Sequence, residues 1–305
     1  MNTAAKDPLF EPNSSSEKAD ELTRPNLSYS KDVLSRLQKN PVAIFSIASL
    51  ALLLFFAILG PSLNHYSYYE TMLEKKNTKP GFEFWFGSDD LGRDLFTRTC
   101  YGARISLFVG FAAAFIDLII GVIYGASAAL LGRRYDEIMM RFADTLYAIP
   151  NLLIIISLMV VIGSGIVPII LCLTISGWIN MARIVRAQVI QLKELEYILA
   201  AKALGASFPR IFFHHILPNV LSSVVVTVTL TIPSAIFIES FLSFLGLGVQ
   251  APIASWGTMA SDGLSALKYY PWRIFFPAAF ISWTMLCFNL LGDALRDALD
   301  PKLRK

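Results

Sequence analysis

The sequence contains apolar runs that are long enough to cross a lipid bilayer as helices. The first run, at residues 41–63, carries no charged side chain, and about 20 apolar residues are enough to cross the hydrocarbon core of a membrane. Hydrophobic residues make up 55% of the chain and charged residues 16%, which is unusual for a soluble domain. The polar residues 1–40 before the first run, and the later runs, argue against a cleaved signal peptide. We therefore expect an all-α polytopic membrane protein.

Six apolar runs are predicted as membrane spans. They cover residues 41–63, 105–131, 146–161, 166–184, 220–241 and 274–291. The third run is short and is interrupted by Pro150, and only the turn at residues 163–165 separates it from the fourth. A helical hairpin explains this spacing. The sequence thus predicts six transmembrane helices.

The basic residues are distributed unevenly between the predicted loops. If the N-terminus is placed in the cytoplasm, 18 of the 26 Lys and Arg residues fall on the cytoplasmic side. Cytoplasmic loops of membrane proteins carry the excess of positive charge. Both termini are therefore predicted to be cytoplasmic.

The predicted spans divide the chain into four regions. Residues 1–40 form a flexible cytoplasmic tail that ends in a short amphipathic helix, for which Ser30 is the candidate N-cap. Residues 41–104 hold the first span and a charge-balanced extracytoplasmic loop, which we expect to pack against the outer mouth of the protein. Residues 105–292 form a core of five spans, and residues 293–305 form a cytoplasmic tail.

The cytoplasmic loop at residues 186–218 is longer than a connection between neighbouring helices requires. Its sequence predicts two short helices at an angle to each other. The first covers residues 192–204 and ends at Gly205, which suits a left-handed C-terminal cap. The second has Ser207 as its N-cap and Pro209 in its first turn.

The first helix of this loop is predicted to offer a contact surface. Ile198, Ala201 and Leu204 are expected on one face, and the small side chains of Ala200 and Ala201 allow another surface to come near. Something is therefore expected to dock there. The alternative is an ordinary amphipathic hairpin that rests on the membrane.

The same loop resembles a known docking motif. The pattern L-A-A-x-x-x-G at residues 199–205, followed by I-L-P at residues 216–218, resembles the E-A-A loop of ABC-importer permeases, with Leu199 where the family usually has glutamate. Three further segments look like the subgroup that imports oligopeptides, dipeptides and nickel, and in particular like its C-type permease subunit; they are residues 86–110, 239–257 and 289–301.

The resemblance implies a fold, partners and a role for the loop. The fold is that of a type I ABC importer permease in the bacterial inner membrane. The chain would pair with a homologous second permease subunit, two ATPase subunits and an extracytoplasmic solute-binding protein. In the family this loop docks on the ATPase. The matching residues here are Leu199, Ala200, Ala201, Lys202, Leu204, Gly205, Ala206, Ser207, Pro209, Arg210 and Pro218.

ATP is expected to bind to the partners and not to this chain. The sequence holds no phosphate-cradling loop of the form G-x-x-x-x-G-K-[ST], so the chain is predicted to be a transporter subunit and not an enzyme. ATP and magnesium would be held by the ATPase subunits. Alternating access driven by those subunits is the mechanism that the resemblance implies.

The substrate implied by the resemblance is an oligopeptide or a dipeptide. Within the family, nickel or another small solute is the alternative. A secondary transporter driven by protons or sodium is a rival, but it would show internal inverted repeats, and the halves of this sequence show no convincing similarity. A scaffold or receptor is a further rival, for which the cytoplasmic segments are too small to form a signalling domain.

Two acidic residues fall within predicted spans. A carboxylate at membrane depth is costly and is a functional candidate by default. Asp117 is expected near the membrane midplane, where it faces either a wet pathway or a hydrogen-bonded helix interface. Glu239 is expected at the outer boundary, where ionisation is cheap.

No metal, cofactor or nucleic acid is expected on this chain. The three cysteines are scattered, and the adjacent His214 and His215 do not share a helix face. The net charge of +3 is spread around the spans, so there is no basic patch of the kind that binds nucleic acid.

Overall fold

The structure, a computed structural model, describes residues 29–300 as an all-helical bundle. The predicted flexible tail before residue 29 and the last residues of the predicted C-terminal tail, 301–305, lie outside the described residues. Between residues 29 and 300 the extended pairing consists of one isolated bridge, between Ser88 and Asp94. The predicted all-α class is confirmed.

Eleven α-helices follow one another along the described chain. A 3-10 turn, η2 (Leu73–Lys75), precedes α3, and a π-helical turn, η3 (Phe212–Ile216), precedes α9. The α-helices are α1 (Tyr29–Lys39), α2 (Pro41–Leu63), α3 (Leu95–Leu130), α4 (Arg133–Ala148), α5 (Asn151–Ile162), α6 (Ile166–Leu192), α7 (Glu196–Ala203), α8 (Phe208–Ile211), α9 (Leu217–Phe244), α10 (Trp256–Leu264) and α11 (Trp272–Leu299).

Five stretches of helix are long and apolar enough to cross a membrane, namely α2, α3, α6, α11 and the run from Pro209 to Phe244 that includes α9. A sixth crossing needs α4 and α5 together, and these are bent by 79°. The predicted third span at residues 146–161 is therefore wrong as a single helix. Pro150 explains the break, because it has no backbone N–H and disfavours helical backbone at Ile149, whose ψ is 128°.

Two N-terminal caps fix helix starts. The start of α2 agrees with the prediction, because Asn40 Oδ1 accepts a hydrogen bond from Val42 N at 2.9 Å. The start of α3 does not agree, because it lies at Leu95 and not at residue 105. There the Asp94 carboxylate accepts a hydrogen bond from the backbone N–H of the third helical residue at 2.8 Å.

The predicted spans at residues 166–184, 220–241 and 274–291 are too short. α6, α9 and α11 each extend beyond the predicted segment, because polar turns at the membrane surface continue the same helix. The predicted cap of the first helix is also wrong. α1 begins at Tyr29, so Ser30 lies within its first turn.

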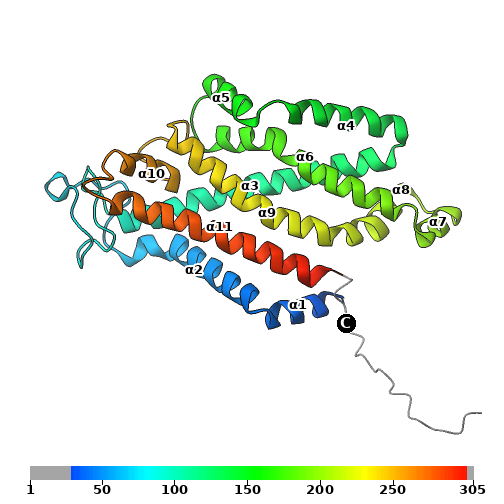
Figure 1. Cartoon of the computed structure of the whole chain (residues 1–305), viewed down its shortest axis with the longest axis horizontal. Helices are drawn as coiled ribbons and strands as arrows, with labels where there is room; N and C mark the ends of the chain where they lie inside the picture. The colour runs from blue at the N-terminus through cyan, green and yellow to red at the C-terminus, as the bar shows by residue number, and fades with distance from the viewer. Residues whose placement is uncertain (1–28, 301–305) are drawn as a thin grey trace, which may run out of the picture.

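α3 packs against α2, α6 and α9 and so joins the two sides of the bundle (Figure 1). Its contact with α6 is close because glycines face that helix. A Cβ on Gly121 would lie 2.5 Å from the Cβ of Met181, and one on Gly125 would overlap the backbone of Ala182. Small residues let membrane helices approach each other, which gains dispersion contacts.

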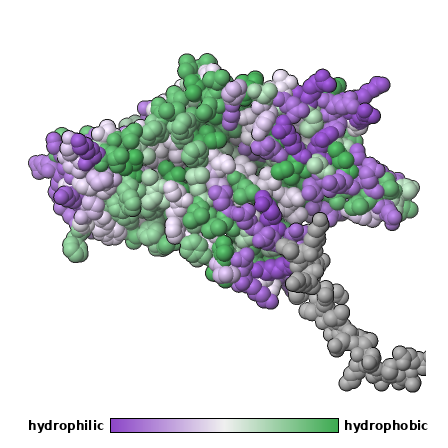
Figure 2. Space-filling view, in the orientation of Figure 1, coloured by the Kyte–Doolittle hydropathy of each residue, from purple (hydrophilic) through white to green (hydrophobic). Residues whose placement is uncertain are grey.

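The bundle has two different ends (Figure 1). The loop at residues 64–94 and α10 lie at one end, here named the loop end, while α1, α7, α8 and the last turns of α11 lie at the other, here named the coupling end. Figure 2 shows hydrophobic side chains over the middle of the visible face and hydrophilic ones towards both ends. This distribution fits a protein whose middle lies in hydrocarbon.

Candidate functional site

A cavity of about 830 Å³ lies between α3, α5, α6 and α9. Polar side chains on its wall include Asp117 of α3, Asn151 of α5, Ser176 and Asn180 of α6, and Thr231 of α9. Volumes of this order are typical of small-molecule sites. The remaining wall is largely aliphatic, so the cavity can hold a solute that has both apolar and polar groups.

The α9 wall of the cavity carries three hydroxyl groups at helical spacing. Thr227, Thr231 and Ser234 line it. Each hydroxyl donates a hydrogen bond to the carbonyl oxygen four residues earlier, at 2.8, 2.9 and 3.2 Å respectively. The donor of each hydroxyl is thus used within the helix, whereas its oxygen can still accept a hydrogen bond. This wall therefore favours ligands that donate hydrogen bonds.

Asp117 lies in the cavity wall at the contact of α3 with α6. Its side chain is buried, with 4% of the residue exposed. Its Oδ1 has no hydrogen-bond partner among residues 29–300. The carboxylate lies directly against Gly177 of α6, where a Cβ would overlap it. The absence of a side chain at Gly177 thus makes room for the carboxylate.

Two arginines also line the cavity, and both already have acidic partners. Arg183 Nη2 donates a hydrogen bond to Asp144 Oδ1 at 2.6 Å, and its guanidinium lies 4.4 Å from the ring centre of Tyr147. Arg296 Nη1 donates to Asp293 Oδ1 at 3.4 Å. The positive charges of the cavity are therefore engaged by carboxylates other than Asp117.

Glu239 is separate from the cavity. It is fully buried, and its carboxylate accepts hydrogen bonds from the hydroxyls of Ser106 at 3.0 Å, Ser243 at 2.9 Å and Ser240 at 3.3 Å. The expected cheap ionisation of Glu239 at the outer boundary does not fit this burial, because α3 and α9 enclose the side chain and supply the donors. The structure therefore places Asp117 in the cavity wall and Glu239 in a helix interface.

The predicted two-helix loop at residues 186–218 is folded differently from the expectation. Its first helix, α7, begins at Glu196 and not at residue 192, because α6 itself continues to Leu192. Its second helix is not separate, because α8, η3 and α9 form one continuous helix from Pro209 to Phe244.

Pro218 explains the π-helical turn η3 in this continuous helix. Proline cannot donate the hydrogen bond that an α-helix needs at this point. The neighbouring Leu217 N bonds instead to Phe212 O, five residues earlier, as in a π-helix. Ser207 and Pro209 lie at the predicted positions at the start of this helix. Ser207 directly precedes α8, its carbonyl accepts a hydrogen bond from Ile211 N at 3.0 Å, and Pro209 lies in the first turn.

The turn between α7 and α8 matches the prediction for Gly205. Its φ is +79°, in the left-handed region that favours glycine. Ala206 follows Gly205, and its N–H donates to Ala201 O at 3.0 Å. This bond closes the C-terminus of α7 as in a Schellman motif.

The predicted common face of α7 does not exist. Ile198 is fully buried, in a cluster with Ile211, Ile216 and Val220 from the α8–α9 helix, whereas Leu204 is 89% exposed. The reason is that α7 ends at Ala203, so Leu204 no longer follows its helical face. Ala201 is half-buried.

Part of the exposed side of the loop is nevertheless apolar. Leu199 is 47% exposed, and Ala200 is exposed beside it. The other residues matched to the docking motif that are exposed are Lys202, Leu204, Gly205, Ser207, Pro209, Arg210 and Pro218. Ile198 thus anchors the loop to the bundle, and the motif presents a surface at the coupling end (Figure 1).

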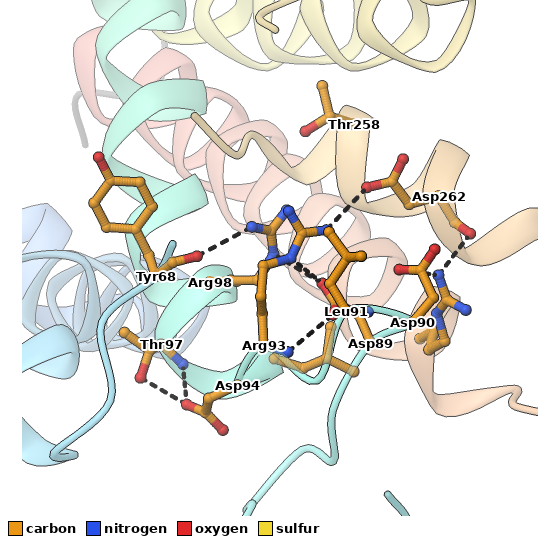
Figure 3. A network of polar contacts seen from close by, with 12 residues as sticks. Tyr68, Asp89, Asp90, Leu91, Arg93, Asp94, Thr97, Arg98, Thr258 and Asp262 are labelled. Atoms are coloured by element: carbon orange, nitrogen blue, oxygen red, sulfur yellow. Dashed lines mark hydrogen bonds and ion pairs between the residues drawn. The ribbon is translucent and has the colours of Figure 1, made fainter. Parts of the chain in front are cut away.

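A network of buried charges holds the loop at residues 64–94 in place (Figure 3). Asp89 is at its centre, with Oδ2 at 2.6 Å from Arg93 Nε and 3.5 Å from Arg98 Nε. Arg98 Nη1 also donates a hydrogen bond to the carbonyl of Tyr68 at 3.1 Å. The side chains of Asp89, Arg93 and Arg98 are each at most 9% exposed. Charges buried this deeply need partners, and these residues supply them to one another.

The network also reaches the last two helices. Arg93 Nη2 lies 4.0 Å from Asp262 of α10, and Arg273 Nη2 of α11 lies 3.1 Å from Asp90. Burial raises the pKa of the Asp262 carboxyl, and the charges of Arg98 and Arg93 act against that rise. The loop, α3, α10 and α11 are thus joined at the loop end. The sequence shows only that this loop is charge-balanced, because the partners of the network come from distant segments.

Groups that could hold a metal are not found in the described part of the chain. No cluster of three or more His, Cys, Asp or Glu side chains is present in it. The three cysteines are buried and unpaired. The described residues therefore offer binding surfaces and a cavity.

The bundle, the solute-sized cavity and the exposed helical loop define a membrane subunit of a solute transport system. Residues 118–305 match the family described as the binding-protein-dependent transport system inner membrane component, and residues 28–80 match the N-terminal TM domain of oligopeptide transport permease C. The chain belongs to this family of ABC-importer permeases. It is a subunit of the inner membrane and not itself an enzyme.

Curated relatives align over nearly the whole chain. The oligopeptide transport system permease protein OppC of Bacillus subtilis is 55% identical over 97% of this chain and 98% of that protein. The dipeptide transport system permease protein DppC of the same organism is 55% identical over 94% of this chain and 90% of that protein. The OppC protein of Escherichia coli strain K12 is 42% identical over 90% of this chain and 91% of that protein.

A solved structure shares the fold. A chain of the MetNI methionine ABC transporter, in inward-facing conformations, aligns with a TM-score of 0.55 and 17% identity, over 67% of this chain and 96% of that chain. The predicted importer-permease fold is confirmed by this likeness.

Proposed function

We propose that this chain is the permease subunit of an ATP-driven importer of oligopeptides or dipeptides. The observation that carries the proposal is the similarity, over nearly the full length, to permeases named for each of these two substrates, at 55% identity in both cases. The cavity of about 830 Å³ supports it, because a peptide is a solute with apolar side chains and many hydrogen-bond donors. The hydroxyl-lined α9 wall suits such donors.

The partners follow from the same proposal. The chain works with a homologous second permease subunit, two ATPase subunits and an extracytoplasmic solute-binding protein. The coupling end, with α1 and the end of α11, lies in the cytoplasm, and the loop end faces the binding protein. Two observations support this orientation. The segments of the coupling end carry the excess of Lys and Arg. The loop at residues 64–94 is held in place at the loop end by ion pairs.

The loop at residues 186–218 transmits force from the ATPase. Leu199, Ala200 and Leu204 present apolar surface that nothing covers among the described residues. Because α8 continues through η3 into α9, a displacement of the loop moves the helix that lines the cavity. ATP binding thereby opens the cavity to the outside, and hydrolysis resets it. Leu199 cannot supply the salt bridge of the family's glutamate, so docking here depends on shape and apolar contact.

Uptake by the reconstituted complex tests the substrate. The chain, its partner permease, the ATPases and the binding protein are placed in proteoliposomes, and uptake of a radiolabelled dipeptide, a radiolabelled pentapeptide and nickel is measured. We expect accumulation of at least one peptide that needs both ATP and the binding protein. Accumulation of nickel with neither peptide would contradict the proposal and would support the alternative small-solute importer.

A further inference from the structure

The cavity contains a buried carboxylate that the chain itself does not satisfy. Four acidic side chains are more than nine-tenths buried in the described chain, and three of them have donors. Asp89 has two arginines, Asp94 has the backbone N–H and hydroxyl of Thr97, and Glu239 has three serines. Asp94 Oδ1 and Asp117 Oδ1 each lack a donor among residues 29–300, but Asp94 accepts its bonds through Oδ2, whereas Asp117 Oδ2 has no donor in the described chain either.

An unpartnered carboxylate at this depth is unfavourable for folding alone. Burial of a polar group without a hydrogen bond is costly, and an acidic residue within a membrane helix costs more. Folding would be served better by an apolar residue against Gly177. Asp117 lies in the wall of the cavity, and of its two oxygens Oδ1 is buried whereas Oδ2 is not. A molecule in the cavity can therefore donate to the carboxylate through Oδ2.

The cavity has no free cation of its own for Asp117. Arg183 is bonded to Asp144, and Arg296 is bonded to Asp293. On α6, Arg183 follows Gly177 by six positions, which is about 9 Å along the helix. Asp117 is thus left without a cationic partner in the described chain, and a positively charged group from outside the chain can take that place.

We propose that Asp117 receives the ammonium group of the transported substrate. An ammonium carries three donors and a positive charge, which match the carboxylate and the acceptor oxygens of Thr227, Thr231 and Ser234 in the same cavity. The ligand class is therefore a primary ammonium, and in a peptide this is the α-ammonium. This inference rests on the proposed function and adds a specificity-determining residue to it.

The alternative partner of the Asp117 carboxylate is a basic side chain of the second permease subunit. In that case Asp117 would be a subunit contact, and the loss of its charge would weaken assembly. Loss of the Asp117 charge distinguishes a substrate contact from a subunit contact, because the loss of a subunit contact affects the uptake of all substrates equally.

The test uses the complete transporter in proteoliposomes and a matched pair of peptides. One peptide has a free α-ammonium, the other is its N-acetylated form, and calorimetry first shows that the binding protein holds both. Uptake of each is measured for wild type, Asp117→Asn and Glu239→Gln. Asparagine keeps the shape and removes the charge. Glu239→Gln is the matched control, because this carboxylate is also buried but lies outside the cavity wall.

Asp117→Asn is expected to lower uptake of the free peptide by about tenfold or more, as for the loss of a hydrogen bond to a charged group. Uptake of the acetylated peptide should change by less than about twofold, so the ratio of the two rates falls. Glu239→Gln should keep the wild-type ratio. Equal loss for both peptides, reduced co-purification of the second permease, or an unchanged ratio would overturn the assignment and leave the proposed function intact. If wild type carries neither peptide, the proposed function itself fails and the inference fails with it.

Discussion

Gly177 of α6 lies against the Asp117 carboxylate in the cavity wall. A methyl group at position 177 would overlap the Asp117 carboxylate. Gly177→Ala is therefore expected to lower the stability of the purified chain by about 1 to 3 kcal/mol through overpacking. Thermal unfolding in detergent measures this loss. Uptake should fall as well, because the carboxylate must move.

A double variant gives the control for this prediction. Removal of the carboxylate in Gly177→Ala/Asp117→Ala should restore most of the lost stability, since the methyl group then has space. If Gly177→Ala alone is neutral, or if Asp117→Ala does not rescue it, the described contact is incorrect.

Arg98 is the buried cation with contacts both to Asp89 and to the loop backbone. Arg98→Ala removes an ion pair and the hydrogen bond to Tyr68 O, and it leaves Asp89 with Arg93 alone. We expect a loss of about 2 to 4 kcal/mol in thermal unfolding and faster proteolysis within residues 64–94.

The exposed pair of Arg133 with Glu137 provides the comparison for Arg98. Both of its side chains are mainly exposed, so Arg133→Ala should have no measurable effect. Equal effects of Arg98→Ala and Arg133→Ala would show that the buried network does not hold the loop.

The conformation of single residues can be predicted from the sequence where local chemistry determines it. Gly205 was predicted from its place after a helix and has a positive φ. Glu239 was misjudged because its donors include Ser106, which is 133 positions away in the sequence. The ion pair of Arg273 with Asp90 likewise joins distant segments. Contacts of this kind depend on tertiary packing and leave no local pattern.

At the scale of elements, α7 carries the coupling hypothesis. Ala200 is exposed on α7, so Ala200→Glu places its charge in water in the isolated chain and should not affect folding. In the docked state the same charge would be buried without a partner. We expect co-purification of the ATPase subunits and solute uptake to fall at least tenfold.

Ala200→Ser is the matched control for α7, because it keeps the small size and should retain both activities. A loop that merely rests on lipid predicts only mild effects of Ala200→Glu. Normal assembly and uptake of Ala200→Glu would therefore refute docking at this surface.

The long spans could be predicted from apolar length, and their irregularities could not. The bounds of α2 agree with the prediction because its apolar run begins directly after a capping Asn40. The bend between α4 and α5 was missed, although Pro150 marked its place. The sequence indicates that a helix is interrupted there, but it does not give the angle of 79° between the two parts.

At the scale of the whole molecule, orientation can be tested by labelling. Single cysteines at the exposed positions Lys76 and Lys268, near the loop end, should react with an impermeant reagent from outside intact cells. Cysteines at the exposed Arg134 and Lys202 should react only after the membrane is opened. The three native cysteines are buried, so their background is low. The reverse pattern at either pair would contradict a cytoplasmic coupling end.

The source of energy is the central claim about the whole molecule, and one measurement tests it. Proteoliposomes that contain the complete transporter are loaded with ATP, or with a non-hydrolysable analogue together with an imposed proton gradient, and peptide uptake is followed with the binding protein present. We predict accumulation with ATP, no accumulation with the analogue despite the gradient, and no ATP hydrolysis by the isolated chain. Accumulation driven by the gradient alone would contradict the account and would identify a secondary transporter.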